Sequence, residues 1–117
     1  MKYFVLLAGY GELPPWDQQS PEEQEENMAR HVAFDEACGA RDGVEMVSAE
    51  ALGDGATATT LRTSGGELTI TDGPFAEAAE HIGGYYLLDA PDLDTVIELC
   101  RILPGYDIEI RPSLDVP

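Results

Sequence analysis

The chain has 117 residues, enough for one domain with its own hydrophobic core and too few for two domains of ordinary size. Hydrophobic residues make up 44% and charged residues 25%, a balance that is typical of globular proteins and excludes wholesale disorder. With 23 Asp and Glu against 6 Lys and Arg, the formal net charge is −17, so we expect the protein to bind neither nucleic acid nor an anionic membrane surface.

The first predicted element is a β-strand at residues 2–8. Both of its alternating faces are apolar, with Tyr3 and Val5 on one face and Phe4 and Leu6 on the other. This pattern is typical of a strand that is covered on both sides of its sheet. A secretory signal is not favoured, because the apolar stretch is short and lacks a cleavage pattern.

A long helix is predicted to follow, from Ser20 to about residue 38. Ser20 is a preferred N-cap, Pro21 suits the first helical position, and Glu23 completes a capping box. Further glutamates in the first turns stabilise the helix through its dipole. Gly39 is expected to end the helix.

Short apolar or alternating segments predict five further strands, at residues 44–47, 57–62, 67–71, 83–88 and 108–111. The second and third of these form a hairpin around Ser64-Gly65-Gly66, with Leu68 and Ile70 on one face. The fourth is apolar on both faces, like the first strand of the chain, which predicts another central strand.

A second helix is predicted between the last two strands. Asp92 is its expected N-cap, and apolar residues recur at helical spacing as far as Leu103. The pair Pro104-Gly105 then stops the helix.

This order of elements predicts an α+β fold: a single domain over residues 1–117, built as a ferredoxin-like βαββαβ plait with an inserted β-hairpin. Helices in such a plait cover only one face of the sheet. Two strands that are apolar on both faces therefore need a second cover, which a symmetric partner sheet would supply. We therefore expect a homodimer.

His31 is the first candidate catalytic residue and lies in the middle of the long helix. Histidine titrates near neutral pH and suits general acid–base chemistry, and Asp35 lies one turn further on, where it could orient the ring. The alternative is a partly exposed helix histidine that simply pairs with a carboxylate.

Asp72 is the second candidate, in the run Asp72-Gly73-Pro74-Phe75. Its side chain can cap a turn where the preceding strand ends, and Pro74 sets the backbone for a short helical turn. In a functional interpretation Asp72 is a carboxylate facing a pocket. In a structural interpretation the run is a corner whose Phe75 fills the core.

No cofactor and no metal are expected. The two histidines, His31 and His81, lie 50 positions apart, and a transition-metal site needs three or four converging ligands. Cys38 and Cys100 have no metal-binding or disulfide spacing and are interpreted as buried thiols of a cytoplasmic protein. Tyr85 and its neighbour Tyr86 are interpreted as core or dimer-interface aromatics.

Three segments in this order resemble the DGPF branch of the YCII-related family: residues 71–77, residues 83–87 and the ending Ile108-Glu109-Ile110-Arg111-Pro112. The resemblance spans nearly the whole chain and implies a ferredoxin-like plait in the dimeric α+β barrel superfamily. In this family a histidine of the first helix and an aspartate are proposed as an active-site pair, and His31 falls where that histidine would.

The resemblance implies two functions of different classes. One is a cofactor-free enzyme that acts on a small organic molecule with His31 and Asp72, since the superfamily includes a dehydrochlorinase, muconolactone isomerases and small monooxygenases. The other is a regulatory or ligand-binding module that associates with an extracytoplasmic-function sigma factor.

Overall fold

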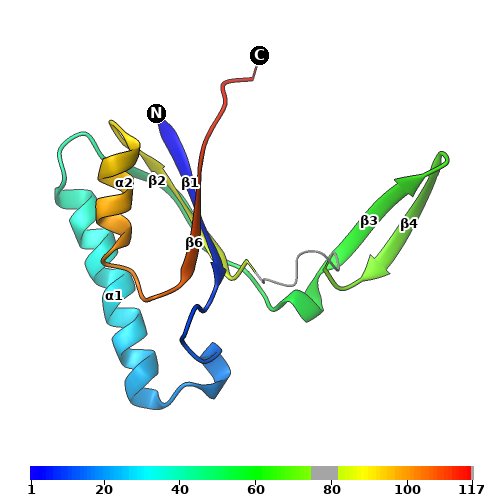
Figure 1. Cartoon of the computed structure of the whole chain (residues 1–117), viewed down its shortest axis with the longest axis horizontal. Coiled ribbons are helices and arrows are strands. Elements are labelled where there is room, and N and C mark those ends of the chain that lie inside the picture. Colours follow the sequence, from blue (N-terminus) through cyan, green and yellow to red (C-terminus); the bar gives the residue numbers. More distant parts are fainter. Residues whose placement is uncertain (75–81, 117) are drawn as a thin grey trace.

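A four-stranded antiparallel sheet forms the centre of the computed structural model, which describes residues 1–74 and 82–116 (Figure 1). Its strands lie in the order β2 (Glu45–Ala51), β5 (Gly84–Asp89), β1 (Lys2–Gly9) and β6 (Asp107–Pro112). Helix α1 (Pro21–Ala40) follows β1 and helix α2 (Leu93–Cys100) follows β5. This is the predicted βαββαβ arrangement, with the first and third strands of the plait in the middle of the sheet.

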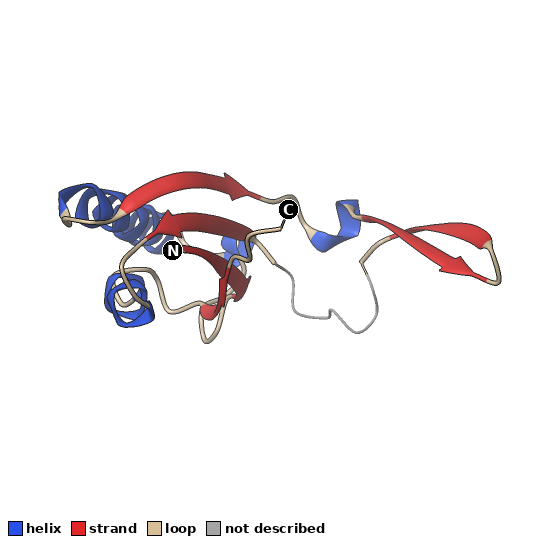
Figure 2. Cartoon of the chain, turned by 90° about the horizontal axis from the view of Figure 1, so that it is seen from above, coloured by secondary structure: helices blue, strands red, loops and turns tan. Residues whose placement is uncertain are grey.

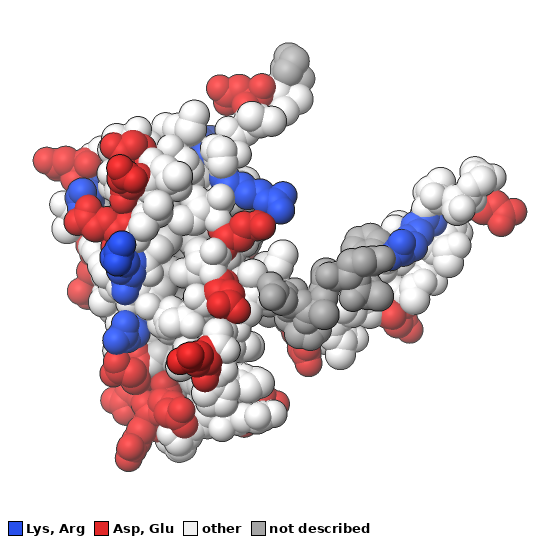
Figure 3. All heavy atoms as spheres, viewed as in Figure 1, with Lys and Arg blue, Asp and Glu red and all other residues white. Residues whose placement is uncertain are grey.

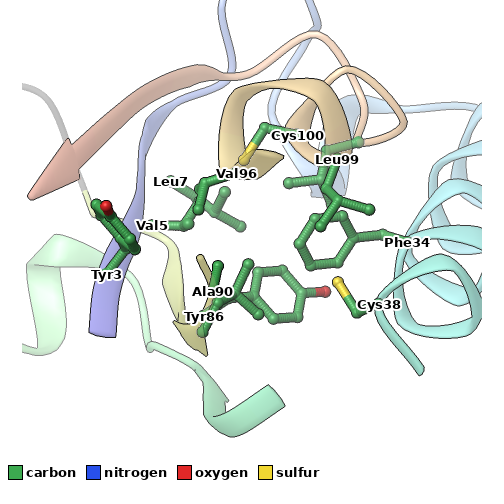
Figure 4. Packing of buried hydrophobic residues seen from close by; sticks show 12 residues of the cluster. Tyr3, Val5, Leu7, Phe34, Cys38, Tyr86, Ala90, Val96, Leu99 and Cys100 are labelled. Atoms are coloured by element: carbon green, nitrogen blue, oxygen red, sulfur yellow. The ribbon is translucent and has the colours of Figure 1, made fainter. Parts of the chain in front are cut away.

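Both helices lie on one face of the sheet, and the core fills the space between (Figures 1 and 4). Val5 from β1, Leu88 from β5, Phe34 from α1 and Val96 from α2 are fully buried. Phe34 packs against the ring of Tyr86, with 4.6 Å between ring centroids. Alternate residues of the two central strands therefore meet the apolar sides of both helices.

The start of α1 confirms the predicted capping box. The backbone N–H of Glu23 donates to Ser20 Oγ, and the backbone N–H of Ser20 donates to the Glu23 carboxylate. The predicted end is slightly wrong, because the helix continues through Gly39 to Ala40 and is capped by Arg41. Gly39 does not adopt a positive φ, so it does not stop the helix.

Replacing Gly39 with alanine is expected to raise the free energy of unfolding by about 0.5–1 kcal/mol. An added Cβ would meet nothing within 4 Å, while alanine lowers the backbone entropy lost on folding. Urea unfolding measures the change. Gly11→Ala is the contrasting variant: Gly11 has a φ of 60°, and its added Cβ would collide with the backbone of Gly105, so this change should destabilise.

Two other element boundaries differ from the prediction. Strand β2 extends to Ala51, beyond the predicted residue 47, because it pairs with β5 along its whole length, with a register shift between Met46 and Ser48. Helix α2 ends at Cys100, but the turns after it still bury Leu103. Asp92 caps the helix as predicted.

The inserted hairpin consists of β3 (Thr59–Ser64) and β4 (Glu67–Asp72) and forms a separate two-stranded sheet. We call it the arm. It projects from the body of the protein on the side of the sheet away from the helices (Figures 1 and 2). Two short 3-10 turns complete the described elements, η1 (Trp16–Gln18) after β1 and η2 (Gly55–Thr57) before the arm. The predicted helical turn around Phe75 lies outside the described residues.

Candidate functional site

A cavity of about 650 Å³ lies between α1, the loop after β1 and the ends of β2 and β5. Its size is within the range of small-molecule sites. Most of its wall is apolar or aromatic, and the principal side chains are Leu7, Tyr10, Trp16, Val32, Met46 and Tyr86. No Lys or Arg lines the cavity within the described part of the chain. Such a wall favours a ligand with an apolar body and no anionic group.

Helix α1 contributes three polar residues to this wall: Asn27, His31 and Asp35. They are spaced four residues apart, so they lie on one side of the helix. The same spacing in the sequence was a usable signal for Asn27, which the sequence analysis did not identify. Asn27 is buried, whereas His31 is half-buried and Asp35 is exposed.

The imidazole of His31 is held between two tyrosine hydroxyls. Nδ1 lies 2.6 Å from the Tyr86 hydroxyl, and Nε2 lies 2.9 Å from the Tyr106 hydroxyl. Tyr106 in turn donates to Asn27 Oδ1 at 2.9 Å, and its ring packs edge-on against Tyr10. Residues from α1, β5 and the turn before β6 therefore form one hydrogen-bond chain.

This chain assigns the tautomer of His31. Because the hydroxyl proton of Tyr106 goes to Asn27, its oxygen accepts a hydrogen bond, and Nε2 of His31 carries the proton that it accepts. Nδ1 is then the acceptor, and the hydroxyl of Tyr86 donates to it. His31 is thus presented as a neutral base whose lone pair points at Tyr86.

The electrostatics agree with a neutral ring. Burial lowers the pKa of His31 below its ordinary value of 6.5, and the charge of Asp35 partly opposes this shift. Burial raises the pKa of both Tyr86 and Tyr106, which keeps the two hydroxyls protonated. The site therefore holds a neutral imidazole and two neutral phenols at neutral pH.

The lowered pKa of His31 predicts a loss of stability in acid. Between pH 6.5 and the lower pKa of the folded state, the unfolded chain binds more protons than the native chain. This contribution to stability is therefore complete above pH 6.5 and is lost as the pH falls through that interval. Urea unfolding of wild type and His31→Gln at several pH values between about 5 and 7.5 measures it. The wild-type curve should be the steeper of the two, and parallel curves would contradict the prediction.

The two sequence candidates are not side by side within one chain. His31 lines the cavity, whereas Asp72 is the exposed last residue of β4, in the arm, and is not among the residues of the cavity wall. Asp35 is the carboxylate whose charge acts on His31. Both ring nitrogens bond tyrosines, so Asp35 acts through its charge rather than by orienting the ring.

Other sequence interpretations meet the structure as follows. Cys38 and Cys100 are buried free thiols, as predicted, and burial raises the pKa of each to about 11. Tyr86 is a core aromatic as predicted, and it also bonds His31. His81 lies outside the described residues. Within the described ranges no cluster of His, Cys, Asp and Glu could hold a metal ion, and no helix has the length and apolarity needed to cross a bilayer.

Comparison with known proteins places the chain. The family model of the YCII-related domain matches residues 3–112. The chain belongs to the YCII-related family. An uncharacterized protein of Rhizobium meliloti (strain 1021) is 42% identical over 60 residues, which are 47% of this chain and 48% of that protein. The match therefore spans about half the length of this relative.

Proposed function

We propose that this YCII-related protein is a cofactor-free enzyme that moves a proton on a small organic substrate bound in the cavity beside His31. The observation that carries the proposal is a neutral imidazole fixed between two phenol hydroxyls at the wall of a mostly apolar cavity of about 650 Å³. A general base needs a defined tautomer and access to the substrate. Because the cavity wall offers no Lys or Arg among its described residues, the substrate is uncharged or cationic.

The proton path follows from the hydrogen bonds. A substrate proton is transferred to the oxygen of Tyr86 while the hydroxyl proton of Tyr86 moves to Nδ1 of His31. His31 becomes an imidazolium, which the charge of Asp35 stabilises. Return of the proton to a second atom of the substrate completes an isomerisation, whereas loss of a leaving group completes an elimination. Asp35 therefore takes the place that the sequence analysis left open between Asp35 and Asp72.

The first test is thermal unfolding against a panel of small aromatic and alicyclic compounds that differ in charge. A ligand at 100 times its Kd adds about 2.7 kcal/mol of stability, which raises the Tm of a domain of this size by roughly 10 °C. Neutral or amine-bearing compounds should stabilise the protein and their carboxylate analogues should not. Proton NMR of each stabilising compound in D₂O with the protein then reports enzyme-catalysed exchange of carbon-bound hydrogen. Ligands that bind without exchange or conversion would contradict catalysis.

The alternative function is a non-catalytic module that binds a basic region of a sigma factor. The net charge of −17 and the acidic side chains gathered over the first turns of α1 support it (Figure 3). It predicts a complex that weakens as salt rises and an empty result from the ligand panel. A pull-down at low and high salt with purified sigma factors tests it.

A further inference from the structure

The arm is an amphipathic sheet with nothing of its own chain on its apolar face. In its register Leu61 lies opposite Ile70, and Thr63 lies opposite Leu68, so these four side chains share one face. The three apolar ones are 54%, 65% and 56% exposed for Leu61, Ile70 and Leu68 respectively. The other face is polar.

Such an arm is not expected to be stable by itself. An isolated two-stranded hairpin is marginal in water, and a hydrophobic face packed against another surface is what stabilises it. The arm projects away from the body, with an open space between them in the space-filling view (Figure 3). Its apolar face therefore needs a cover from outside the chain.

The same chain exposes a second apolar surface of the same kind. On the face of the central sheet away from the helices, Phe4 and Leu6 of β1 lie beside Leu87 and Tyr85 of β5. Phe4 is 36% exposed, and its ring lies 5.8 Å from that of Tyr85. We call this the open face. The arm extends on the side of the body that carries it (Figure 1).

We propose that two copies of this chain pair through their open faces, and that each arm lays its apolar face on the other copy. A two-fold axis lets each copy give one arm and receive one, so both uncovered surfaces of both chains are buried at once. The apolar face of the arm carries neither Lys nor Arg, so its chemistry matches another apolar sheet rather than an acidic surface. Each copy carries a net charge of −17, so contact is made by apolar surface against charge repulsion.

Sedimentation velocity of the full chain tests the pairing. Wild type should sediment at twice the chain mass of 12.6 kDa, and the dimer fraction should rise with NaCl because salt screens the repulsion between the two copies. A chain that stays monomeric at all salt and protein concentrations would overturn the proposal. Covering of the arm by a basic partner would appear in the same way, as a monomer when the protein is alone.

Matched charge substitutions on one strand test the arm. Ile70→Asp places a carboxylate on the apolar face of β4 and should raise the dimer Kd at least about tenfold. Thr71→Asp places the same charge on the polar face of the same strand and should leave the Kd unchanged. Both residues lie outside the buried core, and circular dichroism verifies that each variant folds. Equal Kd values for the two variants would overturn the role of the arm.

Two further measurements locate the contact. Phe4→Glu, on the open face, should also give a monomer, and a folded variant that remains dimeric would overturn pairing through this face. Hydrogen exchange of the amides in β3 and β4 should be slow in the wild-type dimer and fast in Ile70→Asp. Fast exchange in the wild-type dimer would show an uncovered arm and would also overturn the proposal.

Discussion

Replacing Phe34 with alanine is expected to lower the free energy of unfolding by about 3–5 kcal/mol. Phe34 is fully buried and packs at 4.6 Å from the ring of Tyr86, so truncation leaves a cavity between α1 and the sheet. The loss is a large fraction of the 5–15 kcal/mol that is typical of a whole domain. Urea unfolding followed by circular dichroism measures it, and the Tm should fall by more than about 10 °C.

The matched control is Val32→Ala, two residues earlier in the same helix. Val32 is 51% exposed, and its truncation should change stability by no more than about 0.5 kcal/mol. A loss below about 1 kcal/mol in Phe34→Ala would contradict the packing of α1 on the sheet. Because Phe34 supports the ring of Tyr86, the variant should also weaken any ligand that depends on the His31 hydrogen bonds.

Local patterns determine much of this fold. The capping box at Ser20, the N-cap at Asp92 and the doubly apolar strands β1 and β5 are features of short segments, and each predicted its element. The end of β2 was missed because residues 48–51 are small or polar and carry no apolar alternation. Pairing with β5 makes them a strand, and such pairing is not written in a short window of sequence.

The site follows the same division. His31 could be identified by its residue type and its place in a helix. Tyr106 could not, because it lies 75 positions away and reaches His31 only through the path of the chain after α2. The hydroxyl partners decide which ring nitrogen carries the proton, so the chemical state of His31 is a property of the tertiary structure. The position of Asp72, in an arm distant from His31, likewise depends on where the hairpin projects.

Replacing His31 with glutamine is expected to lower kcat by about 10²–10⁴-fold on a substrate found with the ligand panel. Glutamine keeps polar atoms in the cavity wall but cannot take up a proton, so binding should be affected much less than turnover. The fall should therefore appear in kcat rather than in KM. Steady-state kinetics measures both constants. An unchanged kcat would remove His31 from the reaction while leaving ligand binding intact.

The pH dependence of kcat/KM adds a readout that a purely structural histidine would not give. A neutral base is active above its own pKa, so the rate should fall in acid at a pH below 6.5. Asp35 raises the pKa of His31, and Asp35→Asn should therefore move this fall to a still lower pH. Glu36→Gln removes a neighbouring exposed carboxylate outside the cavity wall and should leave the profile in place. Equal profiles for Asp35→Asn and wild type would contradict the assignment of Asp35 as the charge that stabilises the imidazolium.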